Sequence, residues 1–290
     1  MNVLILGATG MLGYSLFSNL SEYPNLNVKG TVRTLNGVEK FFDMYNDQII
    51  KNVDIDDLSS IRKAIDEFKP NIVINCIGVI KQKDTSKNHL KSVQINALLP
   101  HQLASLCDQS NAKLIHFSTD CVFDGSTGFY SEGDIPNAND LYGRSKCLGE
   151  VDYGKHLTIR TSIIGHELSS SRSLIDWFMT QTGEVKGFSK AVFSGLPTVY
   201  LAKVLGEIII PKEDLSGLYH ISVEPINKYA LLSLVSDIYN KKITIQDNSD
   251  LNINRSLNST RFRNKTNFSP LPWEKLIELM HKDYLKRYVH

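Results

Sequence analysis

The first thirteen residues constrain the fold most strongly. Residues 2–6 (NVLIL) form a nearly continuous apolar run, which is typical of a central parallel strand covered on both faces. Gly7, Gly10 and Gly13 follow at once, and a segment with leucines at helical spacing comes next. Glycines at such a turn let the backbone approach a pyrophosphate, which the N-terminus of the following helix holds. This order predicts the first half of a βαβ unit that binds a dinucleotide, although the spacing is GxxGxxG instead of GxGxxG.

Further apolar runs alternate with helical patterns after this unit. The alternation predicts an α/β fold built on a doubly wound parallel sheet. The predicted later strands are residues 27–32, 49–55, 71–76, 113–119 and 156–163. The predicted helices span about 58–69, 88–109 and 142–153.

The ends of these strands supply the candidates for cofactor binding, because ligands of such sheets bind at the carboxyl ends of the strands. Arg33 follows the second strand, where an acidic residue usually binds the ribose hydroxyls. An arginine suits a 2′-phosphate, so the sequence favours NADPH; NADH and a merely solvated arginine remain the alternatives. The candidate cofactor-binding residues are Gly7, Thr9, Gly10, Met11, Leu12, Gly13, Arg33, Asp54, Ile55, Cys76, Ile77, Gly78, Tyr142 and Lys146.

The stretch from residue 113 to residue 146 carries the candidate chemistry. A short apolar strand ends at Thr119, and Tyr142 and Lys146 follow four residues apart, on one face of a helix. A phenol has a pKa of about 10, and a fixed ammonium nearby brings that value toward neutrality. A hydroxyl at the strand end then holds a carbonyl oxygen while the tyrosine donates a proton. The alternative is an ordinary half-buried ring beside a lysine whose stem covers it.

Composition limits the other function classes. The chain has 290 residues, of which 42% are hydrophobic and 22% charged, with a formal charge of +1. Without a basic surplus we expect no nucleic-acid partner, and without a long apolar stretch we expect no membrane partner and a cytoplasmic location. The cysteines show no metal-ligand spacing, so we predict reduced thiols and no tightly bound structural metal.

The later part of the chain reads less regularly. We predict a dinucleotide-binding domain over 1–165, completed by part of 196–222, and a smaller, mixed, discontinuous substrate-binding lobe over 166–290. The predicted helices there are 200–210, 227–240 and 273–288, and the predicted strands are 217–222 and 242–246. Residues 248–265 are polar and are predicted to form a loop.

With these residues placed, the chain resembles the extended short-chain dehydrogenase/reductases, and within them the dTDP-4-dehydrorhamnose reductase family. The similarity spans nearly the whole length. It rests on GATGMLG at 7–13, HFSTDCVFDG at 116–125, YGRSK at 142–146, RTS at 160–162, GLPT at 195–198, GLYHIS at 217–222 and, more weakly, RSLNS at 255–259.

The resemblance implies a reductase of surface polysaccharide precursor synthesis. Hydride would pass from the nicotinamide to C4 of a nucleotide-linked 4-keto-6-deoxyhexose. Tyr142 would protonate the developing alkoxide, Thr119 would hydrogen-bond the oxygen, and Lys146 would lower the tyrosine pKa and grip the nicotinamide ribose. The candidate substrate-binding residues are Thr119, Asp120, Val122 and Arg255. Relatives often form dimers, so a homodimer is the assembly to test, and some relatives use Mg²⁺.

Departures from the family pattern fall in the substrate-facing half. Ile163 stands where the family commonly has tryptophan, Leu201 where it has aspartate, and Ser256 where it has proline. A glutamine usual before the Gly-x-Pro-Thr turn is also absent, since Phe193 and Ser194 stand there. A UDP-linked N-acetylated 4-keto sugar therefore fits as well as a dTDP-linked one. A non-catalytic NADP-binding regulatory subunit and a nucleotide-sugar epimerase are the remaining alternatives.

Overall fold

The computed structural model describes residues 1–79 and 88–289, and these form two compact units. The N-terminal unit comprises Met1–Ser118, Asn139–Ile159 and Ala202–Leu218. The C-terminal unit comprises Thr119–Ala138, Arg160–Leu201 and Tyr219–His290.

A seven-stranded sheet organises the fold, in the order β11-β6-β5-β4-β1-β2-β3. Its strands are β1 (Asn2–Leu6), β2 (Asn27–Thr31), β3 (Ile49–Ile50), β4 (Ile72–Asn75), β5 (Lys113–Thr119), β6 (Leu157–Thr161) and β11 (Gly217–His220). β1 pairs in parallel with β2 and with β4, and β4 pairs in parallel with β5. The predicted doubly wound parallel sheet is confirmed, and β1 lies inside the sheet as its apolar sequence requires.

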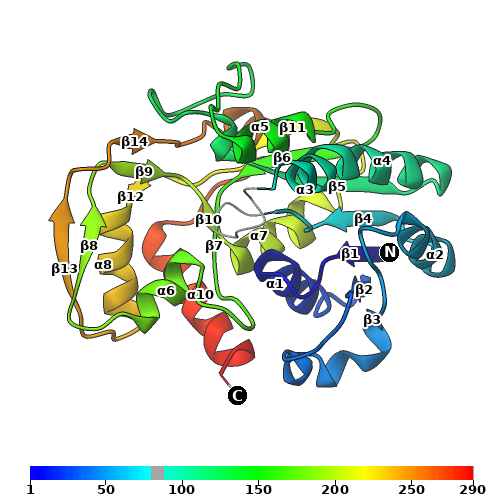
Figure 1. Cartoon of the computed structure of the whole chain (residues 1–290), viewed down its shortest axis with the longest axis horizontal. Helices are drawn as coiled ribbons and strands as arrows, with labels where there is room; N and C mark the ends of the chain where they lie inside the picture. The colour runs from blue at the N-terminus through cyan, green and yellow to red at the C-terminus, as the bar shows by residue number, and fades with distance from the viewer. Residues whose placement is uncertain (80–87, 290) are drawn as a thin grey trace. The chain divides into compact units, whose positions relative to one another are not determined.

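Helices cover both faces of the sheet. Alternate side chains of β1, Leu4 and Leu6, join the core formed with α2 (Leu58–Phe68) and α4 (Leu99–Gln109). α1 (Met11–Leu20) lies on the other side of these strands (Figure 1). It packs closely on β2 because Gly30 has no side chain: a Cβ there would lie 3.1 Å from the Phe17 ring.

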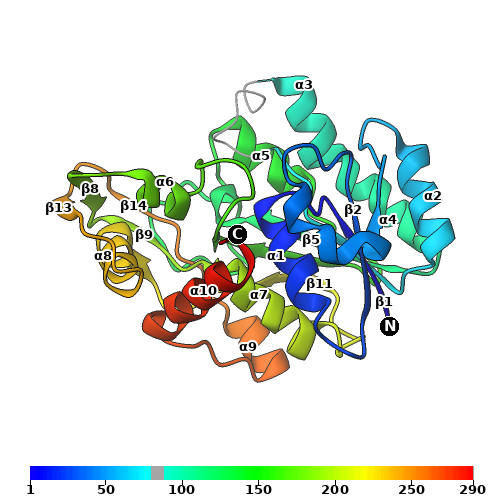
Figure 2. The same cartoon turned by 90° about the horizontal axis from the view of Figure 1, so that it is seen from below.

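The predicted helix over 88–109 forms as one rod with a π-helical turn in its middle. It consists of α3 (His89–Ser92), the π-turn η4 (Val93–Leu98) and α4, and it runs beside α5 (Leu141–Leu148) (Figure 2). Asn96 in the turn is buried, donates to Val79 O at 3.1 Å and accepts from Val79 N–H at 2.9 Å. Its side chain therefore fixes the backbone that follows β4.

Two predicted elements of this unit were too long. The third strand was predicted to reach residue 55, but it ends at Ile50 because Asn52 adopts a left-handed conformation (φ 62°). The helix beginning near Tyr142 was predicted to reach residue 153, but it ends at Leu148. Gly149 follows in close contact with η4, since a Cβ there would lie 1.9 Å from Asn96 O.

The remaining elements lie outside the set described so far. The strands are β7 (Ile163–Ile164), β8 (Glu184–Phe188), β9 (Ala191–Phe193), β10 (Leu196–Pro197), β12 (Ile226–Asn227), β13 (Thr244–Asn248) and β14 (Ile253–Asn254). The α-helices are α6 (Leu174–Thr180), α7 (Thr198–Val204), α8 (Lys228–Ile238), α9 (Thr260–Thr266) and α10 (Trp273–Arg287). Short 3₁₀ or π turns are η1 (Glu39–Phe41), η2 (Asp43–Gln48), η5 (Asp120–Val122) and η6 (Leu205–Ile209).

The C-terminal unit corrects two further sequence predictions. The sixth strand was predicted to continue to residue 163, but Ile163 belongs to β7, which pairs with β10 outside the main sheet. The polar stretch 248–265 was predicted to be a loop, but it contains β14 and most of α9. Its polar groups bond to distant backbone, for example Asn254 N–H to Gly125 O at 2.7 Å, and such partners leave no local periodicity.

Candidate active site

The glycine turn after β1 has the form that a dinucleotide needs. Gly7 is in the left-handed region at φ 84°, and a Cβ on Gly13 would lie 2.0 Å from Gly7 O. Gly10 caps α1 without a side-chain hydrogen bond, so the first-turn amides of Met11, Leu12 and Gly13 face no capping group. Amides in this position bind phosphate, and the turn therefore fits the predicted pyrophosphate.

The ends of β1 and β4 bring other predicted cofactor residues to this turn. A Cβ on Gly7 would lie 2.8 Å from Ile77 Cγ1, and a Cβ on Gly78 would lie 3.5 Å from Asn96 Oδ1. Thr9 is partly exposed in the turn. Burial raises the pKa of the Cys76 thiol far above its usual range, so this thiol stays protonated and acts as an apolar group.

The predicted adenosine-side residues lie in turns. Arg33 is exposed just after β2. Asp54 and Ile55 lie beyond the end of β3 in a turn, where Asp54 Oδ1 accepts from Asp56 N–H at 3.0 Å. Asp56 in turn binds Lys91 Nζ at 2.7 Å. Arg33 is thus available to a phosphate, whereas Asp54 is engaged in shaping its own turn.

Lys146 is buried on α5, one helical turn after the half-buried Tyr142. Its ammonium nitrogen Nζ lies 2.6 Å from Phe117 O and 3.4 Å from His116 Nε2. Burial lowers the pKa of Lys146 to about 8, against the opposing charge of Glu150. A lysine with such a pKa exchanges its proton near neutral pH.

His116 and Asn75 were not predicted as site residues. Both are buried, and Asn75 Nδ2 lies 3.1 Å from His116 Nδ1. Burial, and then the charge of Lys146, hold the pKa of His116 well below its usual range. The sequence signal for His116 was the motif HFSTD, which contains it. The contact to Asn75 depends on strand pairing and therefore left no signal in the sequence.

Thr119 and Asp120 open the 3₁₀ turn η5 in the C-terminal unit. The Thr119 hydroxyl donates to Asp120 Oδ1 at 3.1 Å and accepts from Cys121 N–H at 3.1 Å. Burial raises the pKa of Asp120, while Arg255 and the hydroxyl donors oppose this shift. The predicted substrate residue Val122 has a fully buried side chain.

Arg255 holds the loop that follows Thr119. Its guanidinium donates to Phe123 O at 2.9 Å and to Asp124 O at 3.4 Å, and it lies 3.7 Å from Cys121 Sγ. Lys228 at the start of α8 is mostly buried, its pKa is lowered by this burial, and the charge of Asp120 opposes the change. Lys228 was not predicted, and it adds a second cation near Asp120.

The RTS and GLYHIS motifs meet in the C-terminal unit. Arg160 lies 5.3 Å over the Phe123 ring, and its Nη1 lies 3.3 Å from His220 Nε2. His220 Nδ1 donates to Tyr130 O at 3.0 Å. Burial, followed by the charge of Arg160, lowers the pKa of His220 to about 3, so a neutral imidazole ties these two motifs together.

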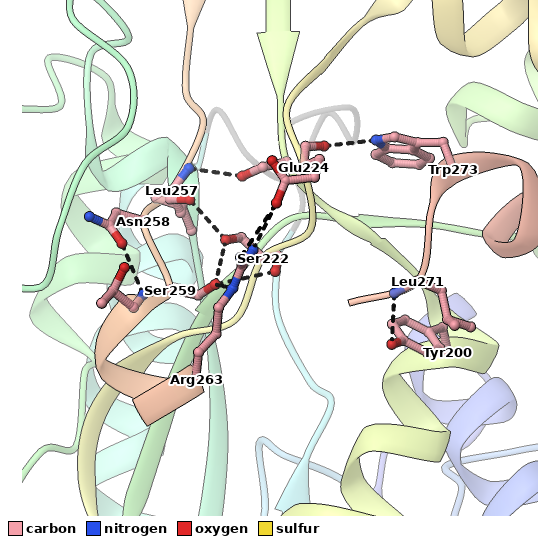
Figure 3. Close-up of polar contacts among 11 residues, drawn as sticks. Tyr200, Ser222, Glu224, Leu257, Asn258, Ser259, Arg263, Leu271 and Trp273 are labelled. Carbon is pink, nitrogen blue, oxygen red and sulfur yellow. Dashed lines mark hydrogen bonds and ion pairs between the residues drawn. The ribbon is translucent and has the colours of Figure 1, made fainter. Parts of the chain in front are cut away.

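The weak motif RSLNS is also a structural junction. Ser222 Oγ donates to Leu257 O at 2.8 Å and lies 3.0 Å from Ser259 Oγ. Arg263 forms an ion pair with Glu224 at 3.3 Å, and the Trp273 indole donates to Glu224 O at 2.7 Å (Figure 3). These contacts place the segment beside the end of the GLYHIS motif.

Two absences hold for residues 1–79 and 88–289. No three His, Cys, Asp or Glu side chains there are grouped so that they could hold a metal ion. Over the same ranges, no helix combines the length and apolar character that crossing a membrane requires.

The motifs and the sheet match a known family. Residues 1–284 match the family model described as the RmlD substrate binding domain. The chain belongs to this family. The expected resemblance to the dTDP-4-dehydrorhamnose reductase group is thereby confirmed.

Three curated relatives illustrate the range of this similarity. The chain is 36% identical over 151 residues to the "Probable low-salt glycan biosynthesis reductase Agl14" of Haloferax volcanii, covering 52% of this chain and 48% of that protein. It is 26% identical over 252 residues to "Methionine adenosyltransferase 2 subunit beta" of Danio rerio, covering 82% and 74%. It is 28% identical over 239 residues to "dTDP-4-dehydrorhamnose reductase" of Aggregatibacter actinomycetemcomitans, covering 77% and 74%. The chain thus spans about half of the first relative and about three quarters of the others.

A solved structure agrees with the fold. The dTDP-4-dehydrorhamnose reductase of Bacillus anthracis in complex with NADP superposes with a TM-score of 0.76 at 22% identity, covering 97% of this chain and 99% of that chain. At this identity the likeness supports the fold alone.

Proposed function

We propose that this protein is an NADPH-dependent reductase of the C4 keto group of a nucleotide-linked 4-keto-6-deoxyhexose, acting in the synthesis of polysaccharide precursors. The observation that carries the proposal is the family match over residues 1–284, in a chain that keeps Tyr142, Lys146 and Thr119 of the family motifs. The named relatives that are reductases support it.

Each catalytic residue has a defined task in this proposal. The glycine turn and Arg33 would hold NADPH, and the bound cofactor would supply the hydride. Tyr142 donates a proton to the sugar oxygen, and the ammonium of Lys146 favours the phenolate that remains. Thr119 gives up its bond to Asp120 Oδ1 and donates to the same sugar oxygen, which stabilises the charge that develops there.

Two sugar classes fit the proposal: dTDP-4-dehydrorhamnose and a UDP-linked N-acetylated 4-keto sugar. Ile163, Leu201 and Ser256 depart from the family pattern in the half that faces the substrate. Arg255, predicted from sequence as a substrate-binding residue, already bonds to two backbone carbonyls. We therefore propose that Arg255 keeps the loop after Thr119 in place. It binds a substrate phosphate only through guanidinium hydrogens that these two bonds do not use.

The test is NADPH oxidation with freshly generated dTDP-4-keto-6-deoxymannose and a UDP-N-acetyl-4-keto-6-deoxyhexose. Tyr142→Phe removes the proton donor, so we expect turnover to fall by about 100-fold or more, with NADPH binding retained. Thr119→Val should lower turnover by about 10-fold or more, because one donor to the oxyanion is lost. Tyr153→Phe is the matched control, since Tyr153 is 48% exposed after α5, and it should keep wild-type turnover.

A specific observation favours one alternative, a non-catalytic NADP-binding regulatory subunit. The methionine adenosyltransferase subunit of Danio rerio aligns with 82% of this chain. Tight NADPH binding without turnover of either sugar would favour this alternative over the reductase. An epimerase, the second alternative, would copurify with tightly held NAD instead of exchanging NADPH.

A further inference from the structure

Asn75 and His116 form a buried pair behind Lys146. They are register partners on the parallel strands β4 and β5, and their side chains are 1% and 0% exposed. Lys146 Nζ reaches the other side of the His116 ring at 3.4 Å. Three polar groups from β4, β5 and α5 therefore meet in the core of the N-terminal unit.

The backbone fixes which way the Asn75 amide points. Ile77 N–H donates to Asn75 Oδ1 at 3.0 Å, and a backbone N–H is always a donor. The opposite amide orientation would place two donors against each other. Asn75 Nδ2 must therefore face His116 Nδ1, which lies 3.1 Å away.

This orientation in turn fixes the tautomer of His116. An amide NH₂ donates only, so His116 Nδ1 must accept, and a neutral imidazole then carries its hydrogen on Nε2. That N–H is directed at Lys146 Nζ. An ammonium has three hydrogens and no lone pair, so it meets the Nε2–H as donor against donor, whereas a neutral amine accepts this N–H and still donates to Phe117 O at 2.6 Å.

We propose that Asn75 and His116 are positioning residues which set the protonation state of Lys146, by presenting a fixed N–H to its side-chain nitrogen. The inference rests on the proposed function, because Lys146 is the partner of the proposed proton donor Tyr142. The amine is the form left after Lys146 passes a proton to the Tyr142 phenolate, and it regains that proton from solvent. Asn75 and His116 stabilise the neutral amine of Lys146, so they favour the return of Tyr142 from the phenolate to the phenol.

The other charges near Lys146 define the background for this effect. Glu150, four residues after Lys146 and just beyond the end of α5, favours the ammonium, while burial disfavours it. Tyr142 lies on α5 as well, and the charge of His101 on α4 contributes to lowering the pKa of His116. The neighbouring α3 carries His89 and Lys91, and η4 carries no titratable side chain. Burial also keeps the pKa of His116 well below its usual range, so its ring is neutral as the tautomer argument requires.

The first test reads the tautomer directly. In protein labelled with ¹⁵N-histidine, the ring nitrogens of His116 are assigned by their loss in His116→Asn. We expect Nε2 to carry the hydrogen and Nδ1 to be bare at pH 7, and Asn75→Asp to reverse this pattern. A hydrogen on Nδ1, or an imidazolium, in the wild type would overturn the proposal.

The second test reads the pH profile of kcat/KM. Asn75→Asp lets a carboxylate accept Nδ1–H, so His116 Nε2 becomes an acceptor for the Lys146 ammonium. His116→Asn keeps an oxygen near the Nδ1 position for Asn75 and removes the N–H that faces Lys146. Both changes stabilise the ammonium, so the alkaline loss of activity should move up by about one pH unit. If it stays at the wild-type pH in both variants, the proposal is wrong.

Two controls separate this effect from general damage and from added charge. His156→Asn alters another buried histidine, whose Nδ1 accepts from Leu114 N–H at 3.1 Å, and it should leave the pH profile unchanged. The double variant Asn75→Asp/His116→Asn keeps the new carboxylate but lacks the ring. The alkaline shift of the double variant should be no larger than the sum of the shifts of the two single variants. The part of the Asn75→Asp shift that the double variant lacks measures the route through His116.

The outcome remains readable if no sugar is turned over. In that case the proposed function fails, but the tautomer of His116 and the titration of Lys146, followed with ¹⁵N-lysine, are still measured. Reversal of the tautomer together with a raised Lys146 pKa in Asn75→Asp would uphold the inference. An unchanged Lys146 titration would overturn it independently of the reaction.

Discussion

Two buried histidines, one in each unit, face opposite kinds of partners. In the C-terminal unit, His166 Nδ1 lies 2.5 Å from Asp176 Oδ1, and its Nε2 lies 2.9 Å from the Tyr239 hydroxyl. The ring donates to an acceptor and accepts from a donor, so every group is satisfied. In the N-terminal unit, His116 faces an amide NH₂ on one side and a lysine on the other.

The difference separates a structural histidine from one that acts on a reactive group. In the matched network of His166, Asp176 and Tyr239, each donor meets an acceptor. Such a network stabilises one arrangement and one charge state. In the mismatched network of Asn75, His116 and Lys146, the His116 N–H meets the ammonium as donor against donor, which disfavours the charged form of Lys146. Such local conflicts persist where function requires them. The same residue type therefore does two different things, according to what the tertiary structure places around it.

The largest test of this comparison removes the acceptor of the matched network. Asp176 also accepts from Glu167 N–H at 2.6 Å and from Ser173 Oγ at 3.1 Å. We expect Asp176→Ala to lower the free energy of unfolding by about 3 kcal/mol, because several partly buried donors lose their partner. Urea denaturation measures this loss. Asp47→Ala, at an exposed position, is the control, and an equal loss in both variants would contradict the comparison.

A second test removes the cation from the mismatched network. Burial lowers the pKa of Lys146 from 10.5 to about 8, so between these values the unfolded chain binds more protons than the folded one, and stability from this group rises with pH. Below pH 8 the buried cation has its full cost. Lys146→Met should therefore raise the free energy of unfolding by about 1–2 kcal/mol at pH 7, while abolishing turnover.

The pH dependence decides this second prediction. The advantage of Lys146→Met should shrink as the pH rises from about 8 toward 10.5, as followed by urea denaturation at each pH. Lys63→Met is the control, since the Lys63–Glu67 pair is exposed, and it should change stability by less than about 0.5 kcal/mol. A constant difference between Lys146→Met and wild type would show that Lys146 does not titrate in this range.

The smallest expected effect concerns the hydroxyl of the matched network. Burial raises the pKa of Tyr239 above its usual range, so its hydroxyl stays a donor to His166 throughout the working pH. Tyr239→Phe should cost about 1 kcal/mol, the contribution of one buried hydrogen bond. The cost should be the same at pH 6, 7, 8 and 9 by urea denaturation. A cost that varies across this range would contradict the assignment of the Tyr239 hydroxyl as a constant donor.

Much of the fold followed from local pattern. The apolar run of β1, the glycine turn and the strand Lys113–Thr119 were predicted with the bounds that the structure has, or within one residue of them. Such elements carry their own signal, because buried parallel strands are uniformly apolar. β14 was missed because its residues pair with β9, far away in the chain. α9 was missed because its sequence is mostly polar, although Phe262 is buried.

The candidate site divides in the same way. The sequence by itself determined the family, the sheet, the glycine turn and the motifs that contain Tyr142, Lys146 and Thr119, since these depend on residues close together in the chain. Only the tertiary structure decided that His116 meets Asn75, 41 residues away, and that both lie behind Lys146. The pairing register of β4 and β5 and the burial by α5 create that contact, and neither leaves a trace in local sequence. Packing therefore sets the protonation state of Lys146, although the lysine itself was identified from the sequence.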